Sequence, residues 1–129
     1  MKKKLSQLKE LHLMNNKLTR LPESMGRLTA LKELRLPDNK LESLPVSIGN
    51  LSSLTHLDLR NNLLSSLPES IGNLQNLTHL DLRANKLSTL PAGIAKLESL
   101  EKLDLRWNRF SSLPAWVNLL QQRGCTIYN

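Results

Sequence analysis

The part of the chain that decides the fold is the stretch LTHLDLRNNLLSSLPESIGNLQN, which runs from Leu54 to Asn76. It reads L-x-x-L-x-L-x-x-N-x-L-x-x-L-P-x-x-I-G-x-L-x-x. The same pattern starts again at Leu8, Leu31, Leu77 and Leu100. Asparagine recurs at intervals of 23 residues, at Asn16, Asn39, Asn62, Asn85 and Asn108. Self-similarity at a fixed period of this length predicts a solenoid, in which each unit buries its apolar residues only against its neighbours.

Each unit predicts a short strand followed by a return arm. The L-x-L stretch alternates with period 2, so Leu11 and Leu13 are expected to point inward and Glu10, His12 and Met14 outward. Stacking the units pairs the strands in parallel, about 4.8 Å apart. The repeated asparagine is expected to hydrogen-bond the turn backbone of its own and neighbouring coils. A proline opens every return arm, which is long enough for a 3₁₀-helix or a single α-turn.

The units form one predicted domain, 1–129, in agreement with the length of the chain. It consists of a half-unit at 1–7, repeats at 8–30, 31–53, 54–76, 77–99 and 100–122, and a C-terminal cap at 115–129. We expect an amphipathic helix in the cap, with Trp116, Leu119 and Leu120 covering the open core. Gly124 suits the position after the helix, and 125–128 suits a final strand in which Cys125 is a small buried hydrophobe.

The first unit has no comparable seal. Residues 1–7 supply half a unit at most, and the lysines at 2–4 are a modest guard against edge-to-edge pairing. We therefore expect faster amide exchange at the N-terminal end than at the C-terminal end, and a monomer with weak self-association through the first strand.

Composition limits the partners. The net charge is +7 and aromatic residues make up 3% of the chain, so leucine and isoleucine must form the core. The charge either keeps an exposed surface solvated or attracts an acidic protein. Nucleic acid is not expected, because neither interleaved basic and aromatic residues nor a groove-reading helix is apparent. A single cysteine, no apolar segment after Met1-Lys2-Lys3-Lys4 and no stretch long enough to span a membrane favour a cytoplasmic protein that does not bind membranes.

These motifs closely resemble the leucine-rich repeat, L-x-x-L-x-L-x-x-N/C-x-L, from about residue 5 to 122. The LPxxIGxL half is similar to the 23-residue subtype of the Ras-group leucine-rich repeat proteins. The resemblance implies an α/β fold: a curved right-handed coil with a parallel β-sheet on the concave face and short 3₁₀ or α turns on the convex side. It also implies that the concave face binds partners, and it makes a small GTPase or another signalling protein a candidate.

The outward strand positions form columns across this face. The candidate partner-binding residues belong to three consecutive strands and are His56, Asp58, Arg60, His79, Asp81, Arg83, Lys102, Asp104, Arg106 and Trp107. The repeated D-L-R triplet places an aspartate column beside an arginine column, which indicates either internal charge compensation or polar recognition of a partner. We expect Arg83 and Arg106 to tolerate charge reversal without loss of the fold, because both point away from the core.

Two features of the face leave alternatives open. His56, Asp58, His79 and Asp81 form a grid of chemically allowed metal ligands, but parallel strands do not readily converge side chains, so no metal is expected. A pH-sensitive surface is the other reading of these histidines. Trp107 either shields the C-terminal end of the sheet or anchors a partner.

The sequence therefore predicts a protein-interaction module. The alternative is a structural or designed repeat scaffold without a natural ligand. No cofactor and no enzymatic activity are expected, because no nucleophile–base pair and no pocket are evident in the sequence.

Overall fold

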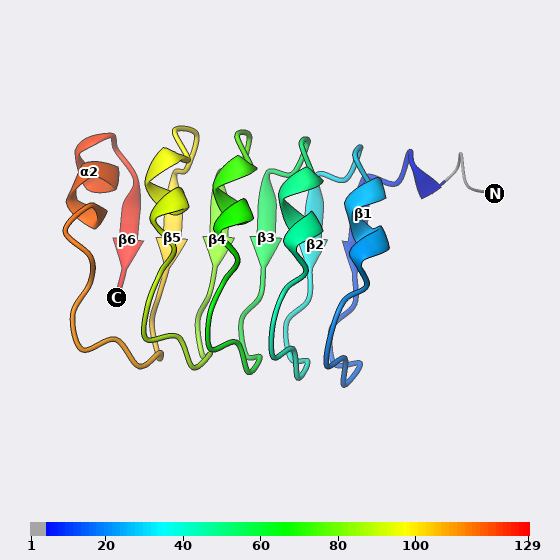
Figure 1. Cartoon of the computed structure of the whole chain (residues 1–129), viewed down its shortest axis with the longest axis horizontal. Coiled ribbons are helices and arrows are strands. Elements are labelled where there is room, and N and C mark those ends of the chain that lie inside the picture. Colours follow the sequence, from blue (N-terminus) through cyan, green and yellow to red (C-terminus); the bar gives the residue numbers. More distant parts are fainter. Residues whose placement is uncertain (1–4) are drawn as a thin grey trace.

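Each repeat forms one coil of a solenoid in the computed structural model, which describes residues 5–129 (Figure 1). The strands are β1 (Glu10–His12), β2 (Glu33–Arg35), β3 (His56–Asp58), β4 (His79–Asp81), β5 (Lys102–Asp104) and β6 (Thr126–Tyr128). The 3₁₀-helices are η1 (Glu23–Arg27), η2 (Val46–Asn50), η3 (Glu69–Asn73) and η4 (Ala92–Lys96), and the last coil holds α2 (Val117–Gln122) instead. The expected 3₁₀ return arms are confirmed.

The strands form one parallel sheet of six strands in the order of the sequence. Its register joins equivalent positions of successive repeats, so that Leu34 pairs with Leu57 and His56 pairs with His79. The last pairing joins Lys102 to Thr126, because the final unit is one residue longer than the others. This register places the outward residues at equivalent positions of successive repeats side by side, in rows that cross the sheet.

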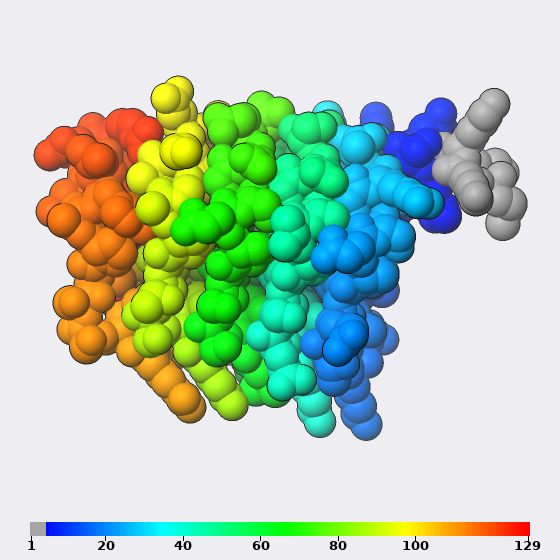
Figure 2. Space-filling model, in the orientation of Figure 1, coloured from blue at the N-terminus to red at the C-terminus, as the bar shows by residue number. Residues whose placement is uncertain are grey.

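The leucine core lies between the sheet and the return helices, which form the opposite layer (Figure 1). Leu34, Leu57 and Leu80 point inward from the strands and are at most 1% exposed, and Ile48 and Ile71 meet them from the helices at 0%. Full burial of such a side chain stabilises the fold by about 2 kcal/mol. Figure 2 shows the coils from the helix side, as successive bands from the N-terminus to the C-terminus.

The repeated asparagine ties neighbouring coils together. Asn62 is 4% exposed, and its Nδ2 donates to the Leu36 carbonyl of the preceding coil at 2.9 Å and to Leu59 of its own coil at 3.0 Å. Its Oδ1 accepts the Leu41 N–H at 3.0 Å. Asn85 repeats these contacts one coil later. The expected role of the asparagine in its own and the neighbouring coil is confirmed.

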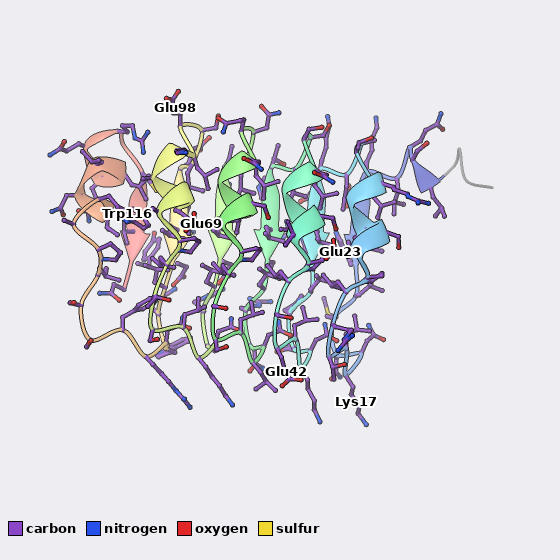
Figure 3. The ribbon with its side chains drawn as sticks, viewed as in Figure 1. Lys17, Glu23, Glu42, Glu69, Glu98 and Trp116 are labelled. Carbon is purple, nitrogen blue, oxygen red and sulfur yellow. The ribbon has the colours of Figure 1, made fainter. Side chains whose placement is uncertain are left out.

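Close contact between return helices depends on glycine. A Cβ on Gly49 would lie 2.5 Å from the Ser70 carbonyl oxygen of the next coil. The Ser70 hydroxyl in turn donates to the Val46 carbonyl at 2.7 Å. Figure 3 labels Glu23 and Glu69 on these helices. We call this surface the return face and the outward surface of β1–β6 the sheet face.

The C-terminal cap uses a different helix face from the expected one. Leu120 is 1% exposed and Val117 5%, whereas Leu119 is 52% exposed, so its predicted place in the core was wrong. Positions three apart share a helix face, which pairs Leu120 with Val117 and turns Leu119 outward. Trp116 is half-buried against the core beside α2 (Figure 3).

The chain after α2 follows the expectation. Gly124 has a φ of +94° directly after Arg123, the residue that caps α2, and β6 begins at Thr126. Cys125 is buried, and its burial raises the pKa of its thiol. No helix within the described range 5–129 has the length and apolar character needed to cross a membrane.

The N-terminal coil is less well covered within the described residues. Leu5 is 58% exposed, and Leu8, Leu11 and Leu13 are only half-buried, although their equivalents in later coils are buried. The predicted role of the lysines at 2–4 lies outside the described residues. Self-association through β1 stays a prediction.

Asn62→Ala and Asn16→Ala test the asparagine ladder at equivalent positions. We expect Asn62→Ala to lower the free energy of unfolding by about 2 to 3 kcal/mol, because buried backbone groups of two coils lose their partners. The Asn16 side chain is exposed and, among residues 5–129, donates only to the Met14 carbonyl, so its loss is expected to cost less than about 0.5 kcal/mol. Urea unfolding of both variants measures the difference. Equal losses of unfolding free energy in the two variants would show that the hydrogen bonds of Asn62 between coils do not stabilise the fold.

Leu120→Ala and Leu119→Ala test the cap. The first creates a cavity and is expected to cost about 3 kcal/mol, while the exposed neighbour is expected to change the free energy of unfolding by less than about 0.5 kcal/mol. Thermal unfolding of the two variants checks this. A larger loss from Leu119→Ala would show that the opposite helix face covers the core.

Candidate protein-interaction face

The sheet face brings most of the predicted residues together around a hollow. The hollow has a volume of about 190 Å³ and is lined by Arg35, His56, Leu57, Asp58, His79, Leu80, Asp81, Arg83, Lys102, Asp104 and Arg106. Eight of the ten predicted residues belong to this lining, while Arg60 and Trp107 lie outside it. The expectation that no pocket is evident was wrong, because the hollow arises between strands and has no signature in any single repeat. Arg35 is a lining residue that the sequence analysis left out of the site.

Arginines neutralise two of the three aspartates in the central column. The Arg83 Nη2 donates to Asp81 at 2.6 Å, and its Nε lies 3.3 Å from an Asp104 oxygen. The Arg106 Nη2 donates to the same Asp104 oxygen at 2.6 Å. This confirms the internal charge compensation. It also makes reversal of Arg83 and Arg106 a poor test, because new carboxylates would face Asp81 and the almost fully buried Asp104.

Burial and hydrogen bonding act in opposite directions on Asp104. Burial alone would raise the pKa of its carboxyl group, but the side-chain and backbone hydrogen bonds from Arg106 outweigh burial and hold the pKa below its usual value. Asp104 is therefore a carboxylate that the fold favours in its charged form.

Asp58 occupies the equivalent position but lacks such a partner. It is 8% exposed, and the nearest guanidinium atom is the Arg60 Nε at 3.7 Å, which is too far for a hydrogen bond. Arg35, on the neighbouring strand, instead donates to Glu33 at 2.7 Å. Burial raises the pKa of Asp58, and the nearby charge of Asp81 raises it further, against the backbone N–H of Arg60. The fold thus disfavours the charged form of Asp58.

The two central histidines stack. The ring centroids of His56 and His79 are 4.4 Å apart and the planes differ by 8°. Burial lowers the pKa of His79, and the neighbouring His56 lowers it further. A parallel stack directs the ring nitrogens side by side and not toward one point, which disfavours the grid of metal ligands considered from the sequence.

Threonines set the tautomer of this pair. The Thr55 hydroxyl lies 3.0 Å from the Lys32 carbonyl and 2.9 Å from the His56 Nδ1. A carbonyl cannot donate, so the hydroxyl gives its one proton to Lys32 and Nδ1–H must donate to the hydroxyl. Thr78 and His79 repeat the arrangement. The contact therefore has the wrong polarity for a nucleophile–base pair, and each neutral ring keeps an accepting Nε2.

One acidic group escaped the sequence analysis. Glu10, His12 and Glu33 place ligand-type atoms within 4.8 Å of one another, the one such group in the described part of the chain. His12 Nε2 lies 3.4 Å from Glu10, and Arg35 already occupies Glu33 and lowers its pKa. Pairing across β1 and β2, visible only once the register is known, brings the three together.

A row of cations and aromatic rings crosses the C-terminal end of the sheet face. Tyr128 lies between the Lys102 Nζ, 5.2 Å from its ring centroid, and the Arg106 Cζ, at 5.1 Å. The Arg106 Cζ is also 5.5 Å from the Trp107 ring. No such interleaving is visible in the sequence, because the final unit brings Tyr128 into line only through its shifted register.

Trp107 does not shield the sheet. It is 70% exposed, β6 lies beyond it at the end of the sheet, and it adopts a left-handed backbone with φ of +61°. Every coil needs this conformation at the rim, where the other residues are Asn15, Asp38, Asn61 and Ala84. For a bulky side chain it costs about 1 to 2 kcal/mol, whereas asparagine and aspartate tolerate it.

Asp58→Asn and Asp104→Asn are expected to change stability in opposite directions at pH 7. Because the pKa of Asp58 is raised in the folded state, its carboxyl group stabilises the fold below about pH 3.9, where it is protonated. This stabilisation is lost as the pH rises through the folded-state pKa. Asparagine mimics the protonated form, so Asp58→Asn should stabilise by up to about 1 kcal/mol.

Because the pKa of Asp104 is lowered in the folded state, its carboxylate stabilises the fold above about pH 3.9. This stabilisation is lost as the pH falls through the folded-state pKa. Asp104→Asn should destabilise by about 1 to 2 kcal/mol at pH 7. Chemical unfolding at pH 7 and near pH 3 measures both effects, which should shrink at the lower pH. The same sign for both variants at pH 7 would refute this difference between the two carboxylates.

Comparison with known proteins agrees with this geometry. A family model described as a leucine-rich repeat region matches residues 2–83 and 47–122. No curated protein gives a significant match. The plant peptide hormone receptor RGFR1, solved in complex with RGF2, superposes with a TM-score of 0.82 at 34% identity over 96% of this chain and 21% of that one.

Two further structures have the same coil. The leucine-rich repeat protein LIC12759 of Leptospira interrogans gives a TM-score of 0.76 at 33% identity over 97% of this chain and 38% of that one. The ectodomain of the receptor kinase SOBIR1 from Arabidopsis thaliana gives 0.76 at 33% identity over 92% and 65%. The chain therefore spans less than two thirds of each of these structures. On its repeat pattern, its coil and these matches, the chain belongs to the leucine-rich repeat family.

Proposed function

We propose that this chain is a protein-interaction module that binds a protein or peptide partner on its sheet face. The observation that carries the proposal is the hollow that eight of the predicted residues line on that face. Six strands spaced about 4.8 Å apart cover about 24 Å, which suits a standard interface of about 800 Å² per partner.

Two cationic side chains of this face are already ordered. Arg83 and Arg106 are held by Asp81 and Asp104, so their positions are largely set before a partner arrives. Such preorganisation lowers the entropy cost of binding. Asp58 and the accepting nitrogens of His56 and His79 add acceptors that the fold leaves underused, which fits a partner with both donors and acceptors.

The similar structures support the choice of partner class. RGFR1 was solved with RGF2 and PEPR1 with AtPEP1, and both superpose on this chain. The similarity to Ras-group proteins makes a small GTPase or another signalling protein a candidate, and a cytoplasmic location accompanies that part of the proposal. The alternative is a scaffold without a ligand, and the following experiment distinguishes it from an interaction module.

A photoreactive amino acid at position 60 of the sheet face or at position 96 of the return face locates the partner. Both positions carry exposed cationic side chains in the native chain, Arg60 and Lys96. We expect crosslinking of a protein from position 60 and not from position 96. Crosslinking only from position 96 would refute the sheet face, and no crosslinking from either position would favour the scaffold.

Charge reversal then measures the contribution of the face to the affinity for the crosslinked partner. Arg60→Glu with Lys102→Glu changes two cations whose side chains donate no hydrogen bond to a carboxylate within residues 5–129, although the Arg60 Nε lies 3.7 Å from Asp58. We expect at least about tenfold weaker binding. Arg27→Glu with Lys96→Glu makes the same change in net charge on the return face and should alter affinity by less than about threefold. Equal losses would indicate a general effect of charge.

A further inference from the structure

We propose that the C-terminal patch, formed by Lys102, Arg106, Trp107 and Tyr128, is the anchor point of the sheet face and receives an acidic protein segment whose carboxylates alternate with apolar side chains. This inference rests on the proposed function, because it names the part of that face that contributes most to affinity and the chemistry of the partner. Three observations carry it: the placement of Trp107, the fixed position of Arg106 and the unpaired charge of Lys102.

Trp107 stands where the fold favours a different residue. The rim turn requires a positive φ, and the coils before it place a small or polar residue there, namely Asn15, Asp38, Asn61 and Ala84. Trp107 accepts the strain of this conformation and remains 70% exposed, outside the leucine core. A strained, exposed aromatic side chain with no role in packing is typical of a binding residue.

Arg106 is held in place at the centre of the patch before a partner binds. Arg106 donates two hydrogen bonds to Asp104, at 2.9 and 2.6 Å. The fixed guanidinium lies near both aromatic rings, 5.1 Å from Tyr128 and 5.5 Å from Trp107. An aromatic side chain has few rotatable bonds, so ordering it costs little entropy on binding. The Trp107 ring therefore offers a large apolar surface beside the fixed guanidinium of Arg106.

The charge of Lys102 selects the partner. Lys102 is exposed, and its ammonium forms no ion pair with any carboxylate in the described residues. Its register neighbours are Thr126 and His79, whose lowered pKa favours the neutral ring. A carboxylate from a partner would supply the missing counter-charge. The net charge of +7 favours approach of the same kind of segment.

A protein segment fits this surface better than nucleic acid. The carboxylates of Asp58, Asp81 and Asp104 form a continuous row beside the cations. A phosphate backbone carries one negative charge per nucleotide and would meet that row along its length. A peptide of a few residues can place a carboxylate on Lys102 and an apolar side chain on Trp107 at one end of the sheet, without running along that row.

Short capped peptides test the chemistry of the segment. The probes are a peptide of alternating glutamate and leucine, its glutamate–serine and lysine–leucine counterparts, and oligothymidine. Titration calorimetry on the whole chain gives affinities, and in a Trp116→Phe background the fluorescence of Trp107 reports contact directly. We expect the glutamate–leucine peptide to bind about tenfold tighter than the glutamate–serine peptide and to perturb Trp107. Tighter binding of oligothymidine or of the lysine–leucine peptide, or no binding of the glutamate–leucine peptide, would overturn the proposal.

Substitutions at one rim position test the anchor. Trp107→Asn should weaken the glutamate–leucine peptide by at least about tenfold and raise the melting temperature by about 3 °C, because it relieves the strained backbone. Trp107→Phe should retain most of the affinity. A lower melting temperature together with unchanged affinity for Trp107→Asn would show a structural residue and overturn the proposal.

Arg60→Glu, outside the patch, separates this inference from the proposed function. If Arg60→Glu weakens the peptide and Trp107→Asn does not, the partner site on the sheet face stands and the anchor is wrong. If neither substitution changes the affinity for the peptide, both the anchor and the partner site on the sheet face are contradicted. The expected result is a loss of at least about tenfold for Trp107→Asn and less than about threefold for Arg60→Glu.

Discussion

The hydrogen bonds of the repeated asparagine are the constraint on which the rest of the structure depends. In the middle of the chain one buried amide satisfies backbone groups on two coils at once, as Asn62 does for Leu36 of the preceding coil and Leu59 of its own. Leucine burial supplies most of the free energy, but it is not directional and tolerates small shifts between coils. The amide tolerates no such shift, because its donors and acceptor must meet fixed carbonyl and N–H groups. The register of the sheet, and with it each outward row, follows from these contacts.

A fixed register separates the two sides of every strand. Inward positions repeat with little variation because each must fill the same space, as Leu57 and Leu80 do. Outward positions are free to differ, and the differences give the sheet face its chemistry. Asp81 and Asp104 accept guanidinium hydrogen bonds, Asp58 does not, and a tryptophan stands where other coils have a small or polar residue. Residues that vary between coils therefore carry the proposed binding chemistry, and residues that repeat in every coil carry the stability.

The sequence was sufficient for whatever depends on the period. The strands, their parallel order, the role of the asparagine and the pairing of Asp81 with Arg83 follow from a 23-residue repeat and elementary geometry. The sequence was insufficient wherever a side chain has several possible partners and only the three-dimensional arrangement decides between them. Asp58 and Asp104 have the same D-L-R context, yet only Asp104 receives guanidinium hydrogen bonds. The histidine stack depends on threonine hydroxyls, and Tyr128 enters the face through one extra residue in the last unit. In the cap, the helix begins at a point that buries Val117 and not Leu119.

Amide hydrogen exchange tests the role of the asparagine ladder most directly. The Leu41, Leu64 and Leu87 N–H groups donate to the asparagine oxygens of the next coil and not to a backbone carbonyl. If the ladder holds the coils together, these three amides exchange as slowly as those within β3 and β4, by opening of the whole stack. Exchange of the three at the rate of unprotected peptides, while the strand amides stay protected, would show that the asparagines decorate a register set by the leucines alone and would contradict the account.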